Sequence, residues 1–291
     1  MNMAIQILIS GVATGCIYAL VALGFYIVYN ASGIINFAHG EFIMMGGVLS
    51  SVGVLTYGAG PIVAVPAAMV LVACAAVLMD RMVLQKARRR SHITLVMLTI
   101  GVGIVLRGLI EVSVGKNVLF PPDFGVVPPL VVMGAYVSSQ AIWIMAMLLV
   151  ASLALWYLLR RTWLGRAMRA TAENPRAALL MGISPRLISG IAFFIAGALG
   201  ALAGALIAPL ASASYDNGLF FGIKGFAAAI LGGLGNPLGA ILGGILIGVI
   251  EAVSAGYIAS AYKDAVALVL LIAMLLLRPS GLIGGLQIKR V

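Results

Sequence analysis

The sequence contains few charged residues. Only 9% of its 291 residues are charged, whereas 63% are hydrophobic and the mean hydropathy is +1.17. A soluble domain carries about 25% charged residues, so this composition excludes a soluble globular protein. It also excludes an intrinsically disordered chain, because disorder requires low hydrophobicity and high charge. The composition is typical of an integral membrane protein.

Residues that form disulfides, metal sites and nucleotide sites are scarce too. The chain has two cysteines and two histidines, and Cys16 and Cys74 both lie inside apolar runs. We therefore expect no disulfide framework and no metal site. The phosphate-binding motif G-x-x-x-x-G-K-[ST] is missing, because Asn117 follows Gly115-Lys116 and the upstream glycine is lacking. We expect no catalytic residues, no cofactor in this chain and no enzyme activity of its own.

The apolar runs are long enough for helices that cross a bilayer, which need about 20 residues each. Strand-like alternation is absent, so the predicted fold is an all-α, polytopic helical bundle in one transmembrane domain, 1–291. The expected spans are 3–29, 35–57, 61–84, 93–114, 140–159 and 187–210. The region after Lys224 divides into 226–234, 238–254 and 264–277, with a break at Gly235-Asn236-Pro237.

Basic residues mark one side of the membrane. Most of the 18 lysines and arginines lie in three clusters, near residues 81–90, 160–186 and 278–290. Lys and Arg in short loops face the cytoplasm, which explains the net charge of +10 better than nucleic-acid binding does. Counting 226–234 as a short span gives nine segments, a periplasmic N-terminus and a cytoplasmic C-terminus. If 226–254 is one helix instead, there are eight spans and the C-terminus lies outside.

The two halves of the chain show a weak internal repeat. A shift of 185 residues aligns Gly33 with Gly218 and brings further glycine pairs together, although a chain with 36 glycines produces such matches easily. The predicted repeats, about 3–114 and 187–280, have opposite orientations, with paired interruptions near 30–40 and 218–225. Inverted repeats with interrupted helices are a recurrent design of transporters.

Several ionisable residues fall inside the predicted spans, where they are costly and usually face a cavity or a partner. Asn36, His39 and Glu41 are candidates for a substrate pathway or gate, and the alternative is that they reach water at a helix start. Lys224 is a further candidate, although Lys224 and Glu251 are also typical of interfacial anchors.

A second set of polar residues predicts a direct contact. Arg107 and Glu111 are four residues apart on one helix face. We therefore expect them to form an intramembrane ion pair.

The cytoplasmic segment 160–186 has its own helix signals. Asn174 suits a cap, Pro175 a first helical position and Gly182 a stop. The predicted helix 175–181 would present apolar side chains outside the membrane, namely Ala177, Ala178, Leu179 and Leu180. Such a surface favours docking of another protein, and the alternative is a helix that lies on lipid.

The string from Ile34 to Glu41, Ile-Ile-Asn-Phe-Ala-His-Gly-Glu, together with Gly11-Val-Ala-Thr-Gly-Cys-Ile-Tyr-Ala-Leu, resembles the permease subunits of branched-chain amino-acid ABC importers of the LivH type. Later landmarks are the segment from Arg166 to Gly182, the glycine-rich string after Lys224, and Arg278-Pro-Ser-Gly.

The resemblance implies a bacterial inner-membrane importer that pairs this chain with a LivM-type permease, two cytoplasmic ATPase subunits that bind ATP and Mg, and a periplasmic binding protein. It also implies that 172–182 is the helix that couples to an ATPase, with contacts from Arg166, Arg169, Glu173, Asn174, Ala177, Ala178 and Gly182. Similar permeases carry urea, short amides or other small organic solutes. A transporter of another class, driven by an ion gradient, would work without these partners.

Overall fold

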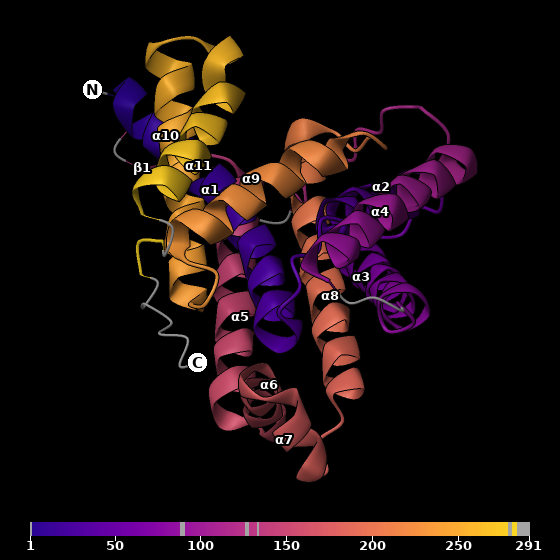
Figure 1. Ribbon diagram of the computed structural model, residues 1–291. Coiled ribbons are helices and arrows are strands. Elements are labelled where there is room, and N and C mark those ends of the chain that lie inside the picture. Colours follow the sequence, from indigo (N-terminus) through magenta and orange to yellow (C-terminus); the bar gives the residue numbers. More distant parts are fainter. Residues whose placement is uncertain (1, 88–90, 126–127, 133, 279–280, 284–291) are drawn as a thin grey trace.

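Helices form almost the whole of the computed structural model, which describes residues 2–87, 91–125, 128–132, 134–278 and 281–283 (Figure 1). The predicted all-α membrane fold is confirmed at this level. In chain order the helices are α1 (Asn2–Ser32), α2 (His39–Leu55), α3 (Pro61–Met79) with the π-helical turn η1 (Asp80–Leu84), α4 (His92–Val114), α5 (Ser139–Arg161), α6 (Trp163–Glu173), α7 (Pro175–Leu180), α8 (Pro185–Ala211), α9 (Asn217–Gly232), α10 (Pro237–Tyr257), the 3-10 turn η2 (Ser260–Tyr262) and α11 (Lys263–Leu277).

Six helices in the described ranges are long and apolar enough to cross a membrane, namely α1, α3 with η1, α4, α5, α8 and α10. Two shorter apolar helices, α2 and α9, accompany them. The predicted boundaries of α2 and α9 need correction: α2 begins at His39 rather than residue 35, and only 226–232 of the predicted span 226–234 is helical, as the second half of α9. The predicted interruption at 218–225 is also wrong, because those residues are helical and the break lies at 212–216.

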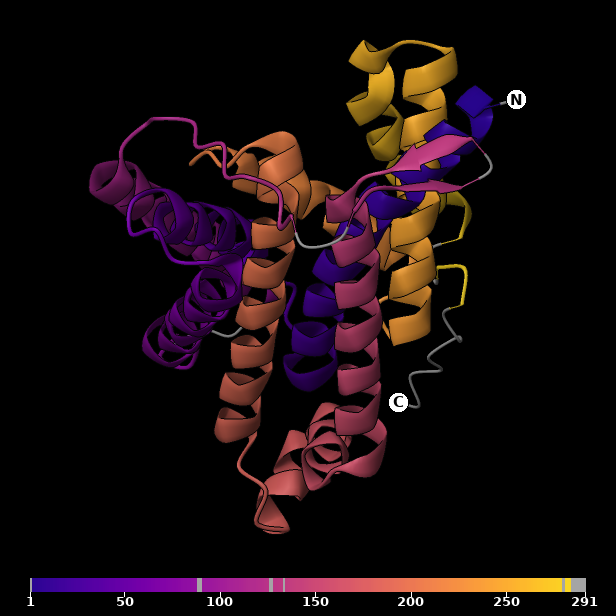
Figure 2. The same ribbon diagram turned by 180° about the vertical axis from the view of Figure 1, so that it is seen from behind.

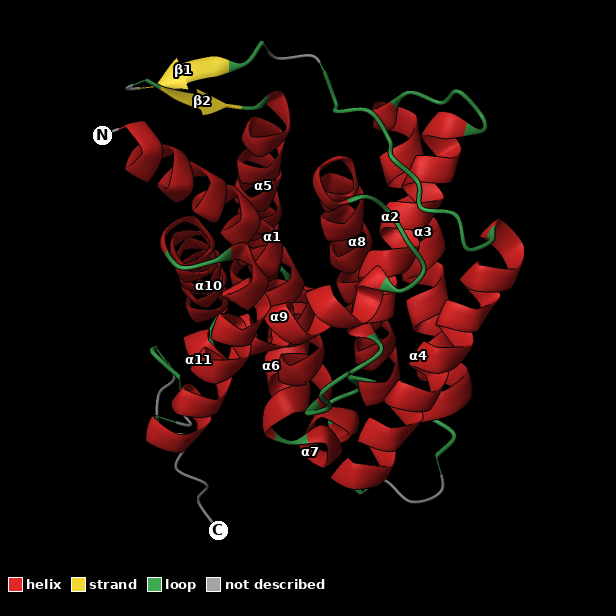
Figure 3. Ribbon diagram, turned by 90° about the horizontal axis from the view of Figure 1, so that it is seen from above, coloured by secondary structure: helices red, strands yellow, loops and turns green. Residues whose placement is uncertain are grey.

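The centre of the molecule is built on α1 and α8. Helix α1 packs against α9 and α10, and α8 packs against α2 and α3, while α1 and α8 also contact each other. Figure 3 shows these two groups on opposite sides of the molecule. Helices α4 and α5 lie at the edge and expose apolar side chains such as Ile104, Val112 and Leu149. Those faces are suited to lipid.

The short helix α2 begins in the interior of the molecule. The Nε2 atom of His39 lies 3.2 Å from the carbonyl oxygen of Val21, in the interior of α1. Ser32, at the end of α1, is eleven residues further on, which is about 16 Å of helix. The chain therefore turns at Gly33, which has a φ of 68°, and runs back along α1 before α2 starts.

The first turns of α2 and α9 cross at their backbones. A Cβ atom added to Gly40 would overlap the carbonyl oxygen of Gly218, and one added to Gly222 would lie 2.9 Å from the Cα of Gly40. A side chain at Gly40 has no room, so glycine is required for this close approach. Two half-length helices thus have their N-termini in the middle of the protein.

The two ends of the molecule differ in structure. At the end that holds the N-terminus, β1 (Leu130–Val132) and β2 (Ala135–Val137) form an antiparallel hairpin (Figure 2). Gln6 holds this hairpin, since its side chain donates to the Tyr136 carbonyl at 2.9 Å and accepts from the Tyr136 amide at 2.7 Å. Helices α6 and α7 lie at the opposite end, beyond α5 and α8 (Figure 1).

Candidate functional site

Three of the predicted pathway residues lie together where α2 begins. Asn36, His39 and Glu41 are 1%, 1% and 5% exposed. They do not reach water at a helix start, so that alternative is wrong. Asn36 accepts from the Ala38 amide at 3.1 Å, and Phe25 and Phe42 flank the His39 ring. The string around Asn36 therefore builds a buried polar centre.

Glu41 forms the ion pair of this centre. Its Oε1 atom accepts from the Nη2 atom of Arg107 on α4 at 2.7 Å. Its Oε2 atom lies against Gly218, in the first turn of α9, and Glu41 itself is in the first turn of α2. Helix N-termini carry partial positive charge. The carboxylate is thus held by one guanidinium and by the fields of two helix ends.

The predicted Arg107–Glu111 pair does not form. Arg107 pairs with Glu41, while Glu111 pairs with Lys116 at 3.0 Å. The reason is tertiary: the buried Glu41 carboxylate from α2 lies beside Arg107, whereas Glu111 lies one turn further along α4, next to the exposed Lys116. The hydrogen bond to Glu111 raises the pKa of the Lys116 ammonium above its ordinary value.

Some polar atoms of this centre lack partners within the described part of the chain. They are Asn36 Nδ2, His39 Nδ1, Glu41 Oε2 and Arg107 Nε. Buried polar atoms almost always have a hydrogen-bond partner in proteins, from the chain or from water. These atoms are where water or a polar solute would be bound.

Lys224 belongs to a second buried cluster. Its Nζ atom donates to Glu251 Oε1 at 2.6 Å and to Tyr18 Oη at 3.2 Å, and it pairs with Asp264 at 2.6 Å. Tyr18 in turn donates to Glu251 Oε2 at 2.7 Å. Lys224 and Glu251 are 8% and 6% exposed, so the interpretation as interfacial anchors is wrong. Tyr18 and Asp264 were not predicted, because only the fold brings α1 and α11 to Lys224.

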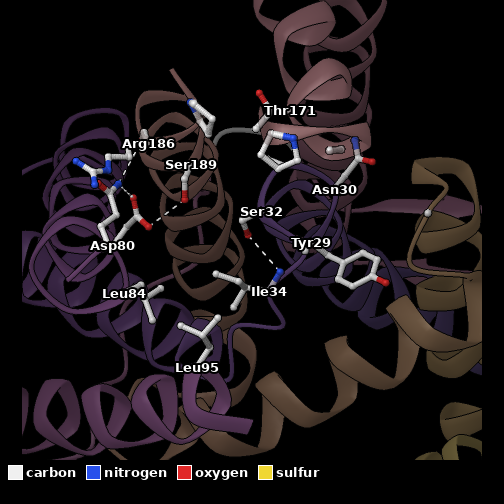
Figure 4. Close-up of a pocket in the computed structure, with 17 residues that line it drawn as sticks. Tyr29, Asn30, Ser32, Ile34, Asp80, Leu84, Leu95, Thr171, Arg186 and Ser189 are labelled. Atoms are coloured by element: carbon white, nitrogen blue, oxygen red, sulfur yellow. Dashed lines mark hydrogen bonds between the residues drawn. The ribbon is translucent and has the colours of Figure 1, made fainter. Parts of the chain in front are cut away.

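The described part of the molecule also contains two sizeable cavities, one beside the Lys224 cluster and one elsewhere in the bundle. One of about 450 Å³ lies beside Lys224, between α1, α9 and α10. Another of about 320 Å³ lies between η1, the end of α1 and α6 (Figure 4). In its wall the buried Asp80 accepts from Ser189 Oγ at 3.0 Å and from Gln85 Nε2 at 2.6 Å. Asp80 was not predicted as a site residue, and its position at the end of an apolar run was the available signal.

The segment between α5 and α8 folds as two short helices. Asn174 caps α7 by accepting from the amides of Arg176 and Ala177, both at 3.1 Å. Gly182, with a φ of 79°, ends it. These local predictions are confirmed, whereas α6, Trp163–Glu173, was not predicted.

One side chain of α7 points the other way from the prediction. Ala178 is only 3% exposed, so it does not present an outer surface. The exposed apolar face consists of Leu179, Leu180 and Met181, at 61%, 89% and 81%. The polar residues of the predicted contact are exposed as expected, namely Arg166, Arg169, Glu173 and Asn174.

Comparison with known proteins identifies the family of this chain. The family model described as "Branched-chain amino acid transport system / permease component" matches residues 7–275. The chain belongs to this family. The permease is 33% identical to the high-affinity branched-chain amino acid transport system permease protein LivH of Escherichia coli K12, over 99% of this chain and 97% of that one. It is equally 33% identical to the corresponding protein BraD of Pseudomonas aeruginosa, over 99% and 98%.

More distant likenesses extend the comparison. The permease is 30% identical to the ribose import permease protein RbsC of Escherichia coli K12, over 79% of this chain and 72% of the relative. Among solved structures, PsaBC from Streptococcus pneumoniae in complex with a Fab matches with a TM-score of 0.53 and 14% identity, covering 96% and 93% of the two chains. That likeness concerns the fold alone.

Proposed function

We propose that this permease carries branched-chain amino acids across the bacterial cytoplasmic membrane as one subunit of a binding-protein-dependent ABC importer. The observation that carries the proposal is α7, which ends beyond the spanning helices with Leu179, Leu180 and Met181 exposed. A helix with such a face outside the bilayer suits a protein cleft. This is the contact that an importer driven by separate ATPase subunits requires.

In this proposal α6 and α7 form the coupling element. The buried Ala167 and Met168 fix α6 against the ends of the spans, so a displacement of α7 would be passed to α5 and α8. Arg166 and Arg169 would lie at the rim of the contact, with Glu173. The ATPase subunits would bind ATP and Mg, and this chain would bind neither.

The remaining partners follow from the same proposal. A second permease of the LivM type would complete the pathway, a periplasmic binding protein would deliver the amino acid, and lipid would cover α4 and α5. Asn36, His39, Glu41 and Lys224 would line the pathway or its gate. Their burial inside the helical bundle and the unpartnered atoms of the first three support this role.

We further infer nine membrane segments, with the N-terminus outside and the C-terminus in the cytoplasm. Contacts along α9 support this count: Lys224 meets Tyr18, and the rings of Phe226 and Phe25 are 5.5 Å apart. The order of these contacts shows that α9 advances in the same general direction as α1, although it crosses α1 at a steep angle (Figure 1). With α10 returning and α11 descending, α11 would run toward the side of the molecule that holds α7, which is the side predicted to be cytoplasmic from its basic residues.

We infer an inverted repeat, 3–114 with 187–280, from the way in which each half packs its first helix into the other half (exchanged packing). The first helix of each half, α1 or α8, packs against the second and third helices of the other half. The two short helices, α2 and α9, then occupy equivalent places and meet N-terminus to N-terminus. Transporters with interrupted helices place their substrate route at such a meeting point.

The test is uptake of radiolabelled leucine into proteoliposomes that contain this chain, its partner permease, the ATPase subunits and the binding protein. We expect uptake that requires ATP and every subunit. Uptake that persists without ATP or without the ATPase subunits would contradict the proposal.

A further inference from the structure

The cavity beside Lys224 combines charged and apolar walls. Its lining includes Tyr18 and the charged residues Lys224, Glu251, Lys263 and Asp264, together with aromatic and aliphatic side chains such as Phe221 and Ile207. Its volume of about 450 Å³ is within the usual range of small-molecule sites, which is about 300–1,000 Å³. A small ligand with opposite charges at one end and an apolar other end would match both walls.

The charges of the cluster are arranged for exchange. Lys224 is surrounded by three oxygen atoms, from Glu251, Asp264 and Tyr18, so two carboxylates share its one positive charge. Lys263 also lines the cavity and brings a second positive charge. The three charged side chains differ in burial: Lys224 and Glu251 are 10% and 7% exposed at the side chain, but Asp264 is 50% exposed. Glu251 is also fixed by Tyr18. Asp264 is therefore the partner of Lys224 that a ligand displaces most easily.

We propose that this cavity binds the charged end of a free α-amino acid: the ligand carboxylate takes the place of Asp264 on Lys224, and the ligand ammonium group donates to the released Asp264 and to Glu251. The exchange leaves every charge with a partner, because a zwitterion brings one charge of each sign. Phe221 and Ile207 then face the aliphatic side chain. The inference rests on the proposed function and adds the part of this chain that recognises the amino acid.

Direct binding tests the two ends of the ligand separately. Radiolabelled leucine is bound at equilibrium to the assembled importer without its binding protein. We expect unlabelled leucine to compete, and 3-methylbutylamine and 4-methylpentanoate, which lack the carboxylate and the amino group, to compete at least about tenfold less well, the effect of a lost hydrogen bond to a charged group. Equal competition by either analogue would overturn the proposal, and would indicate a site for a simple cation or anion.

Variants then connect the site with transport. Lys224→Met and Asp264→Asn should each lower the amount of leucine transported per ATP hydrolysed by about tenfold or more, with the ATPase still stimulated by the binding protein. Lys116→Met is the matched control, because it removes an exposed lysine of another ion pair, and its ratio should stay at the wild-type value. A wild-type ratio in Lys224→Met would overturn the proposed site.

A charge exchange separates ligand binding from a structural role. The double variant Lys224→Glu with Glu251→Lys keeps a buried pair of opposite charges but exchanges their positions. We expect the complex to assemble and its transport ratio to stay low, whereas recovery of transport would show that the cluster is only structural. If the wild-type protein shows no ATP-dependent uptake, the proposed function is contradicted. The competition experiment with leucine and its two analogues would still show whether the cavity binds an amino acid.

Discussion

Glu41 determines the electrostatics at the middle of the permease. Its carboxylate meets Arg107 and the first turns of two helices, and it is only 7% exposed at the side chain. Removing one partner of a buried ion pair leaves the other charge unpaired in the interior. The two members of the pair therefore have different consequences when they are changed.

Glu41→Gln should reduce transport more than assembly, because the amide oxygen still accepts from Arg107 while the charge between the helix ends is lost. Arg107→Gln should lower the free energy of unfolding by up to about 3 kcal/mol, since it leaves Glu41 unpaired. Arg107 is 31% exposed at the side chain, so solvent keeps the loss below that of a fully buried pair. Uptake and thermal unfolding of the purified complex measure the two effects. A larger unfolding effect for Glu41→Gln than for Arg107→Gln would contradict this account.

The ion pairs were beyond prediction from sequence for a physical reason. The spacing of Arg107 and Glu111 on one helix was the only local indication of a partner for Arg107. The partner in the structure, Glu41, is 66 residues away from Arg107 in the chain. In the cluster of Lys224, Tyr18 and Lys224 are 206 residues apart in the chain. A single sequence identifies a costly charge in an apolar run, whereas its partner depends on the tertiary packing.

Among the elements, those with local signals were predicted best. Helix α7 has a capping Asn174, a proline at its first position and Gly182 after its end, and it formed where expected. The start of α2 was placed four residues early, because the segment before His39 is mostly apolar. In the structure Gly33 has a positive φ and the Asn36 side chain accepts from the Ala38 amide, so the chain is not helical from Gly33 to Ala38. The side of α7 that carries Ala178 was also wrong, since six residues are too few to define a face.

Helix α7 gives a prediction on docking. Leu180→Asp should release the ATPase subunits from the purified complex, because it places a charge on the exposed apolar face. Tyr57→Asp, at an exposed aromatic position on the other end of the molecule, is the control and should leave their recovery unchanged. Equal recovery of ATPase subunits with both variants would remove the docking role of α7.

The crossing of α2 and α9 gives a prediction on packing. Gly40→Ala should cost about 1–3 kcal/mol of stability, as overpacking usually does, because the new Cβ would overlap the Gly218 carbonyl. Gly108→Ala is the matched control in α4, where no atom lies within 4 Å of an added Cβ. Thermal unfolding in detergent compares them, and equal midpoints would show that the crossing is not tight.

At the scale of the whole molecule, the membrane class and most long spans follow from composition and apolar runs. The exchanged packing of the two halves does not, because sparse glycine matches carry little information in a glycine-rich chain. The hairpin at Leu130–Val132 and Ala135–Val137 was missed as well. Its strands are three residues each, too short for alternation to be visible.

The orientation of the whole chain has its own test. With Cys74 replaced by serine, Tyr57→Cys should react with a membrane-impermeant maleimide added to intact spheroplasts, while Leu180→Cys should react only after lysis. A reporter fused after Val291 should be active in the cytoplasm. A periplasmic reporter would contradict the nine-segment arrangement.

The crossing at Gly40 and Gly218 also bears on how the two halves can move. Between Gly40 and Gly218 the contact is between backbones, with the Glu41 carboxylate beside it, so few interlocking side chains resist a change in the angle between α2 and α9. The proposed coupling element lies at the far end of the same bundle, and a small displacement there would change this angle without separating the two helices.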